Sequence, residues 1–288
     1  MKPRAFDYLR AESLADVFAA FAAHGEDALI LAGGQNVVPA LNMRLSDPTI
    51  LVDINRIPGL DSIEERDGVV RIGALCRHEA VRRSEVIARH VPLLSQALAH
   101  VAHPAIRNRG TLGGSLCNAD PAAELPACTL ALGATMTIEN ATGSRDVAAT
   151  DFFTGFYETC LVPGDVLTAV SVPAIGEGEV HFFDEIARRQ GDYALAGLAA
   201  VARHEGGRLS SVGFAFHSCG DRALLAPALS ALVEGSASGV IDGAAIDAAL
   251  AGDLDPPDDA VTSSETRLHL AGVLARRALI QFHAGAVA

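Results

Sequence analysis

Two short segments of the sequence place a pair of adjacent glycines beside side chains that form hydrogen bonds. The first is Ala32-Gly-Gly-Gln-Asn36, at the end of an apolar run, and the second is Thr111-Leu-Gly-Gly-Ser115. Glycine lets successive backbone N–H groups point into one concavity, and it lets a ligand approach without a Cβ in the way. We therefore expect both segments to be loops that hold one ligand with two phosphate groups, without a cluster of cationic side chains.

The glycine spacing narrows the kind of phosphate site. Neither segment has the spacing G-x-G-x-x-G or G-x-x-x-x-G-K-[ST], so the sequence predicts neither a Rossmann dinucleotide site nor a P-loop. A single Gly-Gly pair is also typical of an ordinary turn. Spacing alone does not identify the ligand.

The other reactive residue types form no catalytic pattern. The ten histidines show no H-x-H or H-E-x-x-H spacing, and the five cysteines include no C-x-x-C pair. The sequence therefore predicts neither a metal ion nor an iron–sulfur cluster bound by this chain, and the cysteines are expected to be reduced thiols. No Ser-His-Asp or paired-carboxylate arrangement can be read from the spacing, so no catalytic residue is predicted.

Composition limits the class of protein. The chain has 288 residues, half of them hydrophobic, and a net charge of −13, which argues against a surface for nucleic acid or anionic membranes. No stretch approaches the ~18 consecutive apolar residues of a membrane span. The first 21 residues do not resemble a signal peptide. We expect a cytoplasmic protein.

Hydrophobic periodicity predicts the elements that position the two glycine segments. A helix from Leu14 to about Ala23 should begin with a capping box at Ser13 and Asp16, and strands should follow at 28–32, 49–57 and 68–74. This is a β-α-β unit with the first glycine segment at the end of a strand. Residues 77–101 have a helical pattern with a break at Pro92, which is tolerated as a first-turn residue. A short helix near 124–132 and strands near 134–138 and 166–173 come next.

The last third of the chain has a different order of elements. Three strands begin at about Val180, with a hairpin turn at Glu205-Gly206-Gly207, and helices follow at about 223–234, 244–251 and 263–284. The last helix has a capping-box pattern at Thr262 and Glu265. Strands followed by helices indicate an α+β layer, which we expect to be a separate domain beginning near Gly176.

Several segments resemble one protein family. "LAGGQNVVPALNMRL" (31–45) and "IRNRGTLGGSLCNADPAAELPA" (106–127) are similar to segments of the FAD-binding medium subunit of molybdenum hydroxylases, the family of the xanthine dehydrogenase flavin domain and the carbon monoxide dehydrogenase medium subunit. Residues 152–173 and 182–200 match as well. The resemblance covers nearly the whole chain and is weakest after about Asp221.

The resemblance implies a fold and a domain division. The fold class is α+β, with a two-subdomain FAD-binding region of the vanillyl-alcohol-oxidase (PCMH) type followed by a C-terminal α+β domain with an antiparallel sheet and helices. The FAD-binding region spans 1–175, with subdomains of about 1–56 and 57–175, and the C-terminal domain spans 176–288.

The resemblance also implies which residues bind FAD. Two segments wrap the diphosphate and ribityl chain, an acidic side chain faces the cofactor, and a leucine and a tyrosine lie at the flavin end. The implied cofactor-binding residues are Leu31, Ala32, Gly33, Gly34, Gln35, Asn36, Val37, Thr111, Gly113, Gly114, Ser115, Asn118, Asp120, Glu124, Leu167 and Tyr193.

Two positions depart from the family pattern. Asn36 stands where serine is common, so the hydrogen bonds of the first segment are expected to differ, although an amide still donates and accepts. Asp184 stands where the xanthine dehydrogenase flavin domain has lysine, which argues against a role in handling NAD like the one in that enzyme.

Several side chains have two interpretations. Tyr193 is either a flavin neighbour or a core aromatic. Arg107 and Arg109 either neutralise the diphosphate or pair with the acids at 120–124. Arg188 and Arg189 either hold a partner or Asp192, or lie at a solvated strand end.

The implied function is electron transfer. An iron–sulfur subunit would reduce FAD, and the electrons would leave to an external acceptor, while a molybdopterin in a large subunit oxidises the substrate. The implied partners are these two subunits, expected as a dimer of heterotrimers, with no nucleic acid and no membrane span. A stand-alone flavin oxidoreductase and a non-catalytic nucleotide-binding protein are the competing hypotheses.

Overall fold

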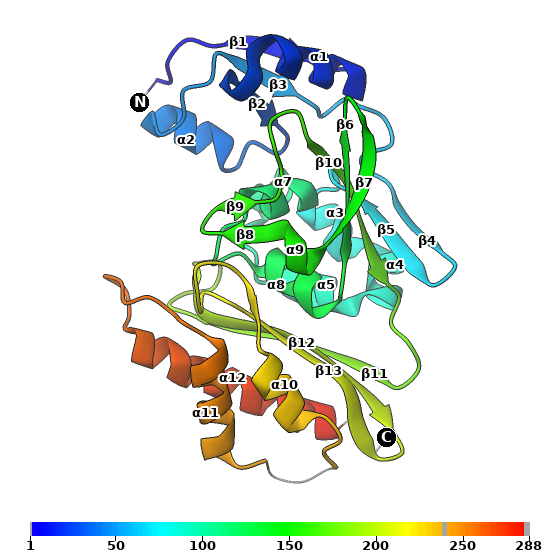
Figure 1. The fold of residues 1–288 in the computed structure, drawn as a ribbon, viewed down its shortest axis with the longest axis vertical. Coiled ribbons are helices and arrows are strands. Elements are labelled where there is room, and N and C mark those ends of the chain that lie inside the picture. Colours follow the sequence, from blue (N-terminus) through cyan, green and yellow to red (C-terminus); the bar gives the residue numbers. More distant parts are fainter. Residues whose placement is uncertain (1, 238–240, 285–288) are drawn as a thin grey trace.

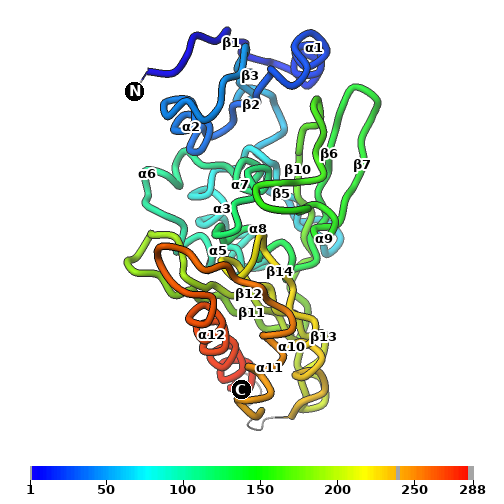
Figure 2. The backbone as a smooth tube through the Cα atoms, turned by 60° about the vertical axis from the view of Figure 1, so that its left-hand side comes forward, coloured from blue at the N-terminus to red at the C-terminus, as the bar shows by residue number. Residues whose placement is uncertain are grey.

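The three larger of the four β-sheets follow one another along the longest axis of the molecule, and the fourth is the two-stranded pair β8-β9 (Figure 1). The computed structural model describes residues 2–237 and 241–284. The N-terminal sheet lies at the top of this view, the largest sheet in the middle, and the C-terminal sheet with its helices at the bottom. A view turned by 60° keeps the same order (Figure 2). None of the helices in the described chain is long and apolar enough to cross a membrane.

The N-terminal sheet is parallel and carries the first glycine segment. Its strand order is β1-β3-β2, and Leu31, the last residue of β2, pairs with Asp53, the last residue of β3. The carboxyl ends of these strands therefore meet at one edge. The elements are β1 (Asp7–Arg10), α1 (Leu14–His24), the 3₁₀ turn η1 (Gly25–Asp27), β2 (Ala28–Leu31), α2 (Val37–Met43) and β3 (Ile50–Asp53).

The predicted start of α1 is confirmed. Ser13 Oγ accepts from the backbone N–H of Asp16 at 3.3 Å, and Asp16 Oδ2 accepts from the N–H of Ser13 at 2.9 Å. Strand β1 was not predicted. It is a strand because it pairs in parallel with β3, a partner distant in sequence.

The middle sheet is antiparallel, with the order β4-β5-β10-β6-β7. Helices α3 to α8 lie beside it (Figure 1). The elements are β4 (Ile63–Arg66), β5 (Val69–Gly73), α3 (His78–Arg83), α4 (Glu85–His90), α5 (Pro92–Leu98), α6 (Pro104–Arg107), α7 (Leu112–Asn118), α8 (Glu124–Ala131), β6 (Thr135–Asn140), β7 (Gly143–Ala148), α9 (Ala149–Phe152), β8 (Phe153–Gly155), β9 (Glu158–Thr159) and β10 (Val166–Pro173).

The helical region predicted at 77–101 is three helices: the predicted break at Pro92 is confirmed, and a further break at Ser84 was not predicted. Ser84 has an extended backbone and caps α4, because its Oγ accepts from the N–H of Ile87. Pro92 begins α5, where its fixed φ and missing N–H are tolerated. These two residues stop and restart the helix, while the apolar periodicity continues across both breaks.

The C-terminal sheet is antiparallel and has helices on both faces. Helix α8 packs on β12 and β13 from one side, and α12 packs on β11 and β12. The hairpin at Gly206-Gly207 is confirmed, and both glycines have positive φ. The elements are β11 (Glu179–Ala187), β12 (Ala194–Glu205), β13 (Arg208–His217), β14 (Leu224–Leu225), α10 (Pro227–Val233), α11 (Gly243–Asp253) and α12 (Ser264–Ala284).

Two details of the predicted C-terminal helices are wrong. The segment predicted as the start of a helix at 223 first forms β14, and α10 begins at Pro227. The residue before α12 is Ser263 rather than Thr262, and Ser263 Oγ accepts from the N–H of Thr266 at 3.2 Å. Both differences move an element boundary and leave the number of helices as predicted.

The hydrophobic core crosses from the middle sheet to the C-terminal sheet. Phe183, Ala199 and Ala215, on three neighbouring C-terminal strands, belong to the same buried cluster as α5 and α8. The N-terminal sheet has its own cluster, which includes Leu60, Leu75 and Val166 from outside its strands. Because apolar side chains are shared at these junctions, the three layers are held in fixed positions around the space between them.

Candidate functional site

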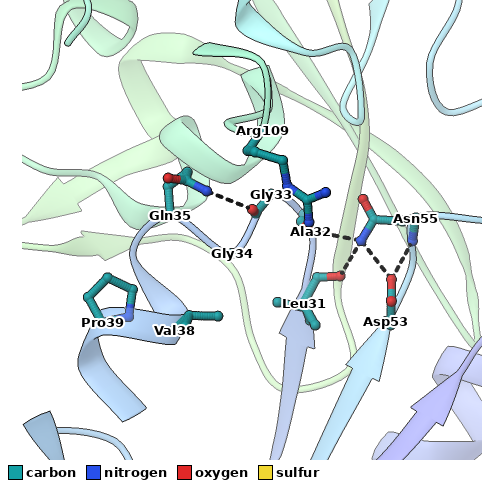
Figure 3. Close-up of a pocket in the computed structure, with 10 residues that line it drawn as sticks. All are labelled: Leu31, Ala32, Gly33, Gly34, Gln35, Val38, Pro39, Asp53, Asn55 and Arg109. Atoms are coloured by element: carbon teal, nitrogen blue, oxygen red, sulfur yellow. Dashed lines mark hydrogen bonds between the residues drawn. The ribbon is translucent and has the colours of Figure 1, made fainter. Parts of the chain in front are cut away.

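One cavity of about 530 Å³ brings the predicted residues together. All the predicted cofactor-binding residues except Leu31 line it, and both glycine segments contribute to its wall. Leu31 lines a smaller cavity of about 330 Å³ that shares Ala32, Gly33, Gly34 and Gln35 with the larger one (Figure 3). The residues that sequence reasoning singled out are therefore neighbours in space.

The two glycine segments touch through their backbones. A Cβ at Gly33 would overlap the carbonyl oxygen of Arg109, and it would lie 3.0 Å from the Cα of Gly110. Since the neighbours are backbone atoms, they cannot move aside as the end of a side chain can. Gly33 is needed for this close approach, which joins the N-terminal sheet to the segment before α7.

The first segment offers a run of free N–H groups. No hydrogen bond within the described residues uses the backbone N–H of any residue from Gly33 to Val37. Gly34 has φ +74°, in the left-handed region that glycine adopts without strain. Gln35 Nε2 donates to the Gly33 carbonyl, so this side chain is fixed next to the loop (Figure 3). Successive unpaired N–H groups of this kind bind anions.

The second segment is not the loop that the sequence predicted. Gly113 and Gly114 lie in the first turn of α7, and Thr111 is its N-cap, with Oγ1 accepting from the N–H of Gly114 at 3.1 Å. The N–H of Gly113 donates to the Ala74 carbonyl, and the N–H of Leu112 donates to the Cys76 carbonyl. The expectation of free N–H groups here is therefore wrong.

The glycines of the second segment have packing roles instead. A Cβ at Gly113 would lie 2.6 Å from the Cβ of Ala74, so Gly113 lets α7 pack against the end of β5. Gly114 faces the cavity and is exposed. The hydroxyl of Ser115 and the amide of Asn118 line the cavity without a hydrogen-bond partner among the described residues. This wall therefore presents side-chain donors and acceptors rather than backbone N–H groups.

Arg77 connects the two glycine segments, and sequence reasoning missed it. Its Nη2 donates to Asn55 Oδ1 at 2.6 Å, and its Nη1 donates to the carbonyl of Arg109. Asn55 in turn donates through Nδ2 to the Ala32 carbonyl at 2.8 Å and to Asp53 Oδ1 at 2.6 Å (Figure 3). These hydrogen bonds connect Asp53 at the end of β3, through Asn55 and Arg77, to the backbone carbonyl of Arg109, which Gly33 contacts.

A signal for Asn55 was present in the sequence. Asp53 and Asn55 end one strand of a predicted β-α-β unit and the glycine segment ends another, and parallel strands bring their carboxyl ends to the same edge. No comparable signal exists for Arg77, which is distant from both segments in sequence.

The buried His78 forms a hydrogen bond to the backbone of the second glycine segment. Its ring is buried, and Nε2 donates to the Thr111 carbonyl at 2.9 Å. The ring also leaves no room for a larger residue at Gly110, where a Cβ would lie 3.0 Å from Nδ1. Burial lowers the pKa of His78 to about 4, so the ring is neutral at pH 7.

The arginines before the second segment have separate roles. Arg107 donates to Glu79 Oε2 at 3.1 Å, so it neither pairs with the acids at 120–124 nor faces the cavity as a free cation. Glu79 also accepts hydrogen bonds from Arg82 and Arg83. The hydrogen bonds from the three arginines lower the pKa of Glu79, and the one from Arg82 has the largest effect. Arg109 is exposed, lines the smaller cavity, and pairs with no carboxylate of the described residues. Of the two alternatives for Arg109, only neutralisation of a ligand remains open.

The other part of the cavity is lined by Leu167, Glu124 and Tyr193. Leu167 is buried on β10. Tyr193 is 71% exposed, so the interpretation as a core aromatic is wrong. Its position is fixed by the β11–β12 connection, where Gly191, with φ +82°, packs against the carbonyl of Ala102.

The two departures from the family pattern have different surroundings. The amide of Asn36 makes no hydrogen bond within the described chain and lines the cavity, so it is available to a ligand. Asp184 accepts from Arg277 of α12 at 2.6 Å, on the sheet face opposite to its neighbours Phe183 and Glu185. Arg188, Arg189 and Asp192 are exposed and form no ion pair among the described residues; Asp192 and Arg189 are joined only through the backbone, where the N–H of Asp192 donates to the Arg189 carbonyl at 3.1 Å.

Two family models match the chain. Residues 4–175 match "FAD binding domain in molybdopterin dehydrogenase", and residues 181–282 match "CO dehydrogenase flavoprotein C-terminal domain".

Curated relatives match over nearly their whole length. The alpha subunit of the 6-hydroxypseudooxynicotine dehydrogenase complex of Paenarthrobacter nicotinovorans is 40% identical over 97% of this chain and 95% of its own. The medium chain of carbon monoxide dehydrogenase of Afipia carboxidovorans is 35% identical, over 97% of both chains.

Solved structures share the fold. A chain of carbon monoxide dehydrogenase from Hydrogenophaga pseudoflava matches with a TM-score of 0.94 and 34% identity, over 99% of both chains. A chain of quinoline 2-oxidoreductase from Pseudomonas putida 86 matches with a TM-score of 0.92 and 39% identity, over 100% of both chains.

Replacement of Arg77 tests the link between the glycine segments. We expect Arg77→Met to lower the free energy of unfolding by about 1–3 kcal/mol, because Asn55 Oδ1 and the Arg109 carbonyl lose their donor. Arg66→Met is the matched control, since Arg66 is exposed and its change should stay within about 0.5 kcal/mol. Denaturant unfolding measures both, and equal stabilities of the two variants would contradict the assigned role.

The buried His78 predicts a loss of stability in acid. In the unfolded chain His78 has its ordinary pKa of 6.5, and in the folded protein its pKa is about 4. As pH falls, the unfolded chain therefore binds the proton at a higher pH than the folded protein does. Stability is therefore retained above pH 6.5 and lost as pH falls towards 4. Between pH 7 and 5 the wild type should lose about 2 kcal/mol more than His78→Gln. Denaturant unfolding at both pH values measures the difference, and the same loss in both proteins would refute the prediction.

Proposed function

The chain belongs to the family of FAD-binding medium subunits of molybdenum hydroxylases, and on this basis we propose that it is the electron-transfer subunit of a heterotrimeric enzyme. In this proposal it takes electrons from a small iron–sulfur subunit and passes them through FAD to an external acceptor. Substrate oxidation takes place in a large molybdopterin subunit, so the residues of this chain do not select the substrate.

The free N–H groups from Gly33 to Val37 are the observation that carries the proposal. They face a cavity whose volume is in the range of cofactor sites, and they bind the FAD diphosphate in a chain with a net charge of −13. Arg109 supplies a positive charge beside them. Ser115, Asn118 and the Cβ-free surface of Gly114 form the opposite wall and contact the ribityl chain.

The remaining predicted residues orient the flavin. Leu167 gives an apolar contact, and Tyr193 covers the ring at the rim of the cavity. When bound, FAD supplies the redox chemistry itself, so this chain needs no general acid or base of its own for electron transfer. The protein positions the cofactor and restricts the access of water.

The partners are proposed from the relatives and from the surface. The relatives are named as a complex subunit and a medium chain, which supports a complex with iron–sulfur and molybdopterin subunits. Phe156 and Tyr157, between β8 and β9, are 68% and 50% exposed, and exposed aromatic residues are typical of protein interfaces. We propose a dimer of heterotrimers in the cytoplasm, where the five free cysteines stay reduced.

The domain division is part of the same proposal. The boundaries of the two family models, at residues 175 and 181, support a FAD-binding PCMH-type domain at 1–175 and a C-terminal domain at 176–288. The parallel and antiparallel sheets of the first domain correspond to subdomains of about 1–56 and 57–175.

Co-purification tests the subunit role. We expect a tagged chain, expressed with the products of its neighbouring genes, to bring down an iron–sulfur and a molybdopterin subunit, and the complex to reduce an external dye with substrate. If the chain never binds such subunits but turns over a substrate alone, the stand-alone flavin oxidoreductase is correct. A chain without flavin absorbance even after addition of FAD would support the nucleotide-binding hypothesis.

Replacement of Gly33 tests the diphosphate site. Gly33→Ala should weaken FAD binding roughly tenfold or more, because overpacking against the Arg109 backbone costs about 1–3 kcal/mol and shifts the free N–H groups. The control is Gly252→Ala, where a Cβ would meet no atom within 4 Å. Flavin absorbance after gel filtration gives the bound fraction, and normal FAD content in Gly33→Ala would exclude the first segment as the diphosphate site.

A further inference from the structure

A buried polar cluster lies behind the cavity wall, between the middle layer and the C-terminal sheet. Glu185 of β11 and His217 of β13 both pair with Gly197 of β12, so the three residues form one row across the sheet. The side chain of Glu185 is 5% exposed and that of His217 is fully buried. Helix α8, which carries the cavity-lining Glu124, packs on the same strands. We call Glu124, Glu185, His100 and His217 the acid–histidine cluster.

Gly197 makes this row possible. A Cβ at Gly197 would overlap the imidazole ring of His217, so the ring lies across the middle strand. This places Nε2 of His217 3.8 Å from Oε2 of Glu185. The ring also stacks on Phe183, with centroids 5.9 Å apart and planes within 10°.

His100 approaches Glu185 from the other side. Its Nδ1 lies 3.5 Å from Oε1 of Glu185, and its side chain is 36% exposed. His100 comes directly after α5, which packs against β11. The cluster therefore extends from solvent at His100, through the buried Glu185, towards Glu124 at the cavity.

The buried groups of the cluster are incompletely paired. Glu185 Oε2, both ring nitrogens of His217 and Ser218 Oγ have no hydrogen-bond partner among the described residues. Glu185 and His217 are almost fully buried, so the four groups of the cluster cannot all carry full charge without a large cost in free energy. The protons of the cluster must therefore be distributed among its members.

The directions of the pKa shifts agree with this. The pKa of Glu124 is raised to about 8, with burial as the largest cause; the charges of Glu185 and Asp120 also raise it, while a backbone hydrogen bond and the charge of His100 lower it. Burial lowers the pKa of His217 to about 4, so that ring is neutral. The hydrogen bond to Glu185 raises the pKa of His100. Glu124 is thus mainly protonated at pH 7, and the raised pKa of His100 favours the protonated imidazole 3.5 Å from Glu185 Oε1.

The titratable groups around Glu124 come from α8 itself, from β11 and β13, and from the segments that follow α5, α7 and β11. Within the described chain they are Asp120, Cys128, His100, Glu185, His217 and Tyr193. Glu124 is the member of the cluster that lines the cavity. Its protonation therefore responds both to a charge in the cavity and to the Glu185–His100 pair.

We propose that Glu124, with the Glu185–His100 pair behind it, is a redox-linked proton site that takes up a proton from solvent when the bound flavin is reduced. This inference rests on the proposed function, since it requires FAD in the cavity. Two electrons from the iron–sulfur subunit, with fewer than two protons bound by the flavin, add negative charge next to Glu124. The Glu124 carboxylate then forms an O–H bond with a proton that enters past His100, and it releases the proton when the electrons leave. The proton compensates the charge of the reduced state, so reduction at alkaline pH is easier than it would be without Glu124.

The test measures the flavin potential and proton uptake as functions of pH. The FAD-loaded full chain is titrated with a chemical reductant and mediators from pH 6 to 10, and an indicator dye in weakly buffered solution reports protons bound per flavin. Near and above pH 8, the wild type should take up as much as about one proton per flavin more than Glu124→Gln. Glu64→Gln, an exposed acid on β4, should behave as the wild type.

For two further variants we expect opposite shifts in the pH at which the extra proton is taken up. These variants test the inference even if Glu124→Gln folds poorly. Glu185→Gln removes a negative charge, so the extra uptake should move to lower pH. His100→Gln removes a positive charge, so the uptake should move to higher pH. Identical profiles in all flavin-loaded variants would overturn the proton site and leave the proposed function intact, whereas a wild-type chain that binds no FAD would defeat the proposed function itself.

Discussion

The backbone contact between Gly33 and Arg109 is the constraint on which the site depends. It joins two segments that are distant in sequence, and only a residue without a Cβ fits there. Arg77 fixes the contact, because it donates both to Asn55 at the end of β3 and to the Arg109 carbonyl. This contact fixes the start of the segment from Gly33 to Val37, whose five backbone N–H groups have no partner among the described residues. An anion site made from backbone needs such rigid support, since no long side chain can adjust to the ligand.

The charges of the protein are arranged so that few cations are needed. Arg107 forms an ion pair with Glu79, so its charge is neutralised within the fold. The buried His78 is neutral and donates to the Thr111 carbonyl without adding a charge. Arg109 remains beside the first segment as a cation without a carboxylate partner among the described residues. The proposed site therefore lets a chain with a net charge of −13 hold an anionic cofactor with local N–H groups and one guanidinium.

The C-terminal sheet belongs to the site as much as the glycine segments do. It shares its core with α5 and α8, and its β11–β12 connection places Tyr193 at the rim of the cavity. The row formed by Glu185, Gly197 and His217 puts polar groups behind Glu124, where an apolar core would be expected. A buried polar row that is only partly paired lowers stability, so its presence beside a redox cofactor site is consistent with a role in proton binding.

Local patterns in the sequence determined most elements, the α+β layer of the C-terminal region and the two glycine segments of the cavity wall. The resemblance to the family, rather than a local pattern, supplied Asn118, Asp120, Glu124, Leu167 and Tyr193. The capping box at Ser13, the hairpin at Gly206-Gly207 and the two glycine pairs are short-range signals, and each is read within a few residues. Only the tertiary structure decided that Gly113 and Gly114 begin a helix, that Arg77 and His78 support the glycine segments, and that Tyr193 is exposed. These features depend on contacts between distant parts of the chain, such as Leu112 with Cys76 and Glu185 with His100. Periodicity reports which face of an element is apolar, but the partner of a hydrogen bond or a charge is fixed only when the sheets pack together.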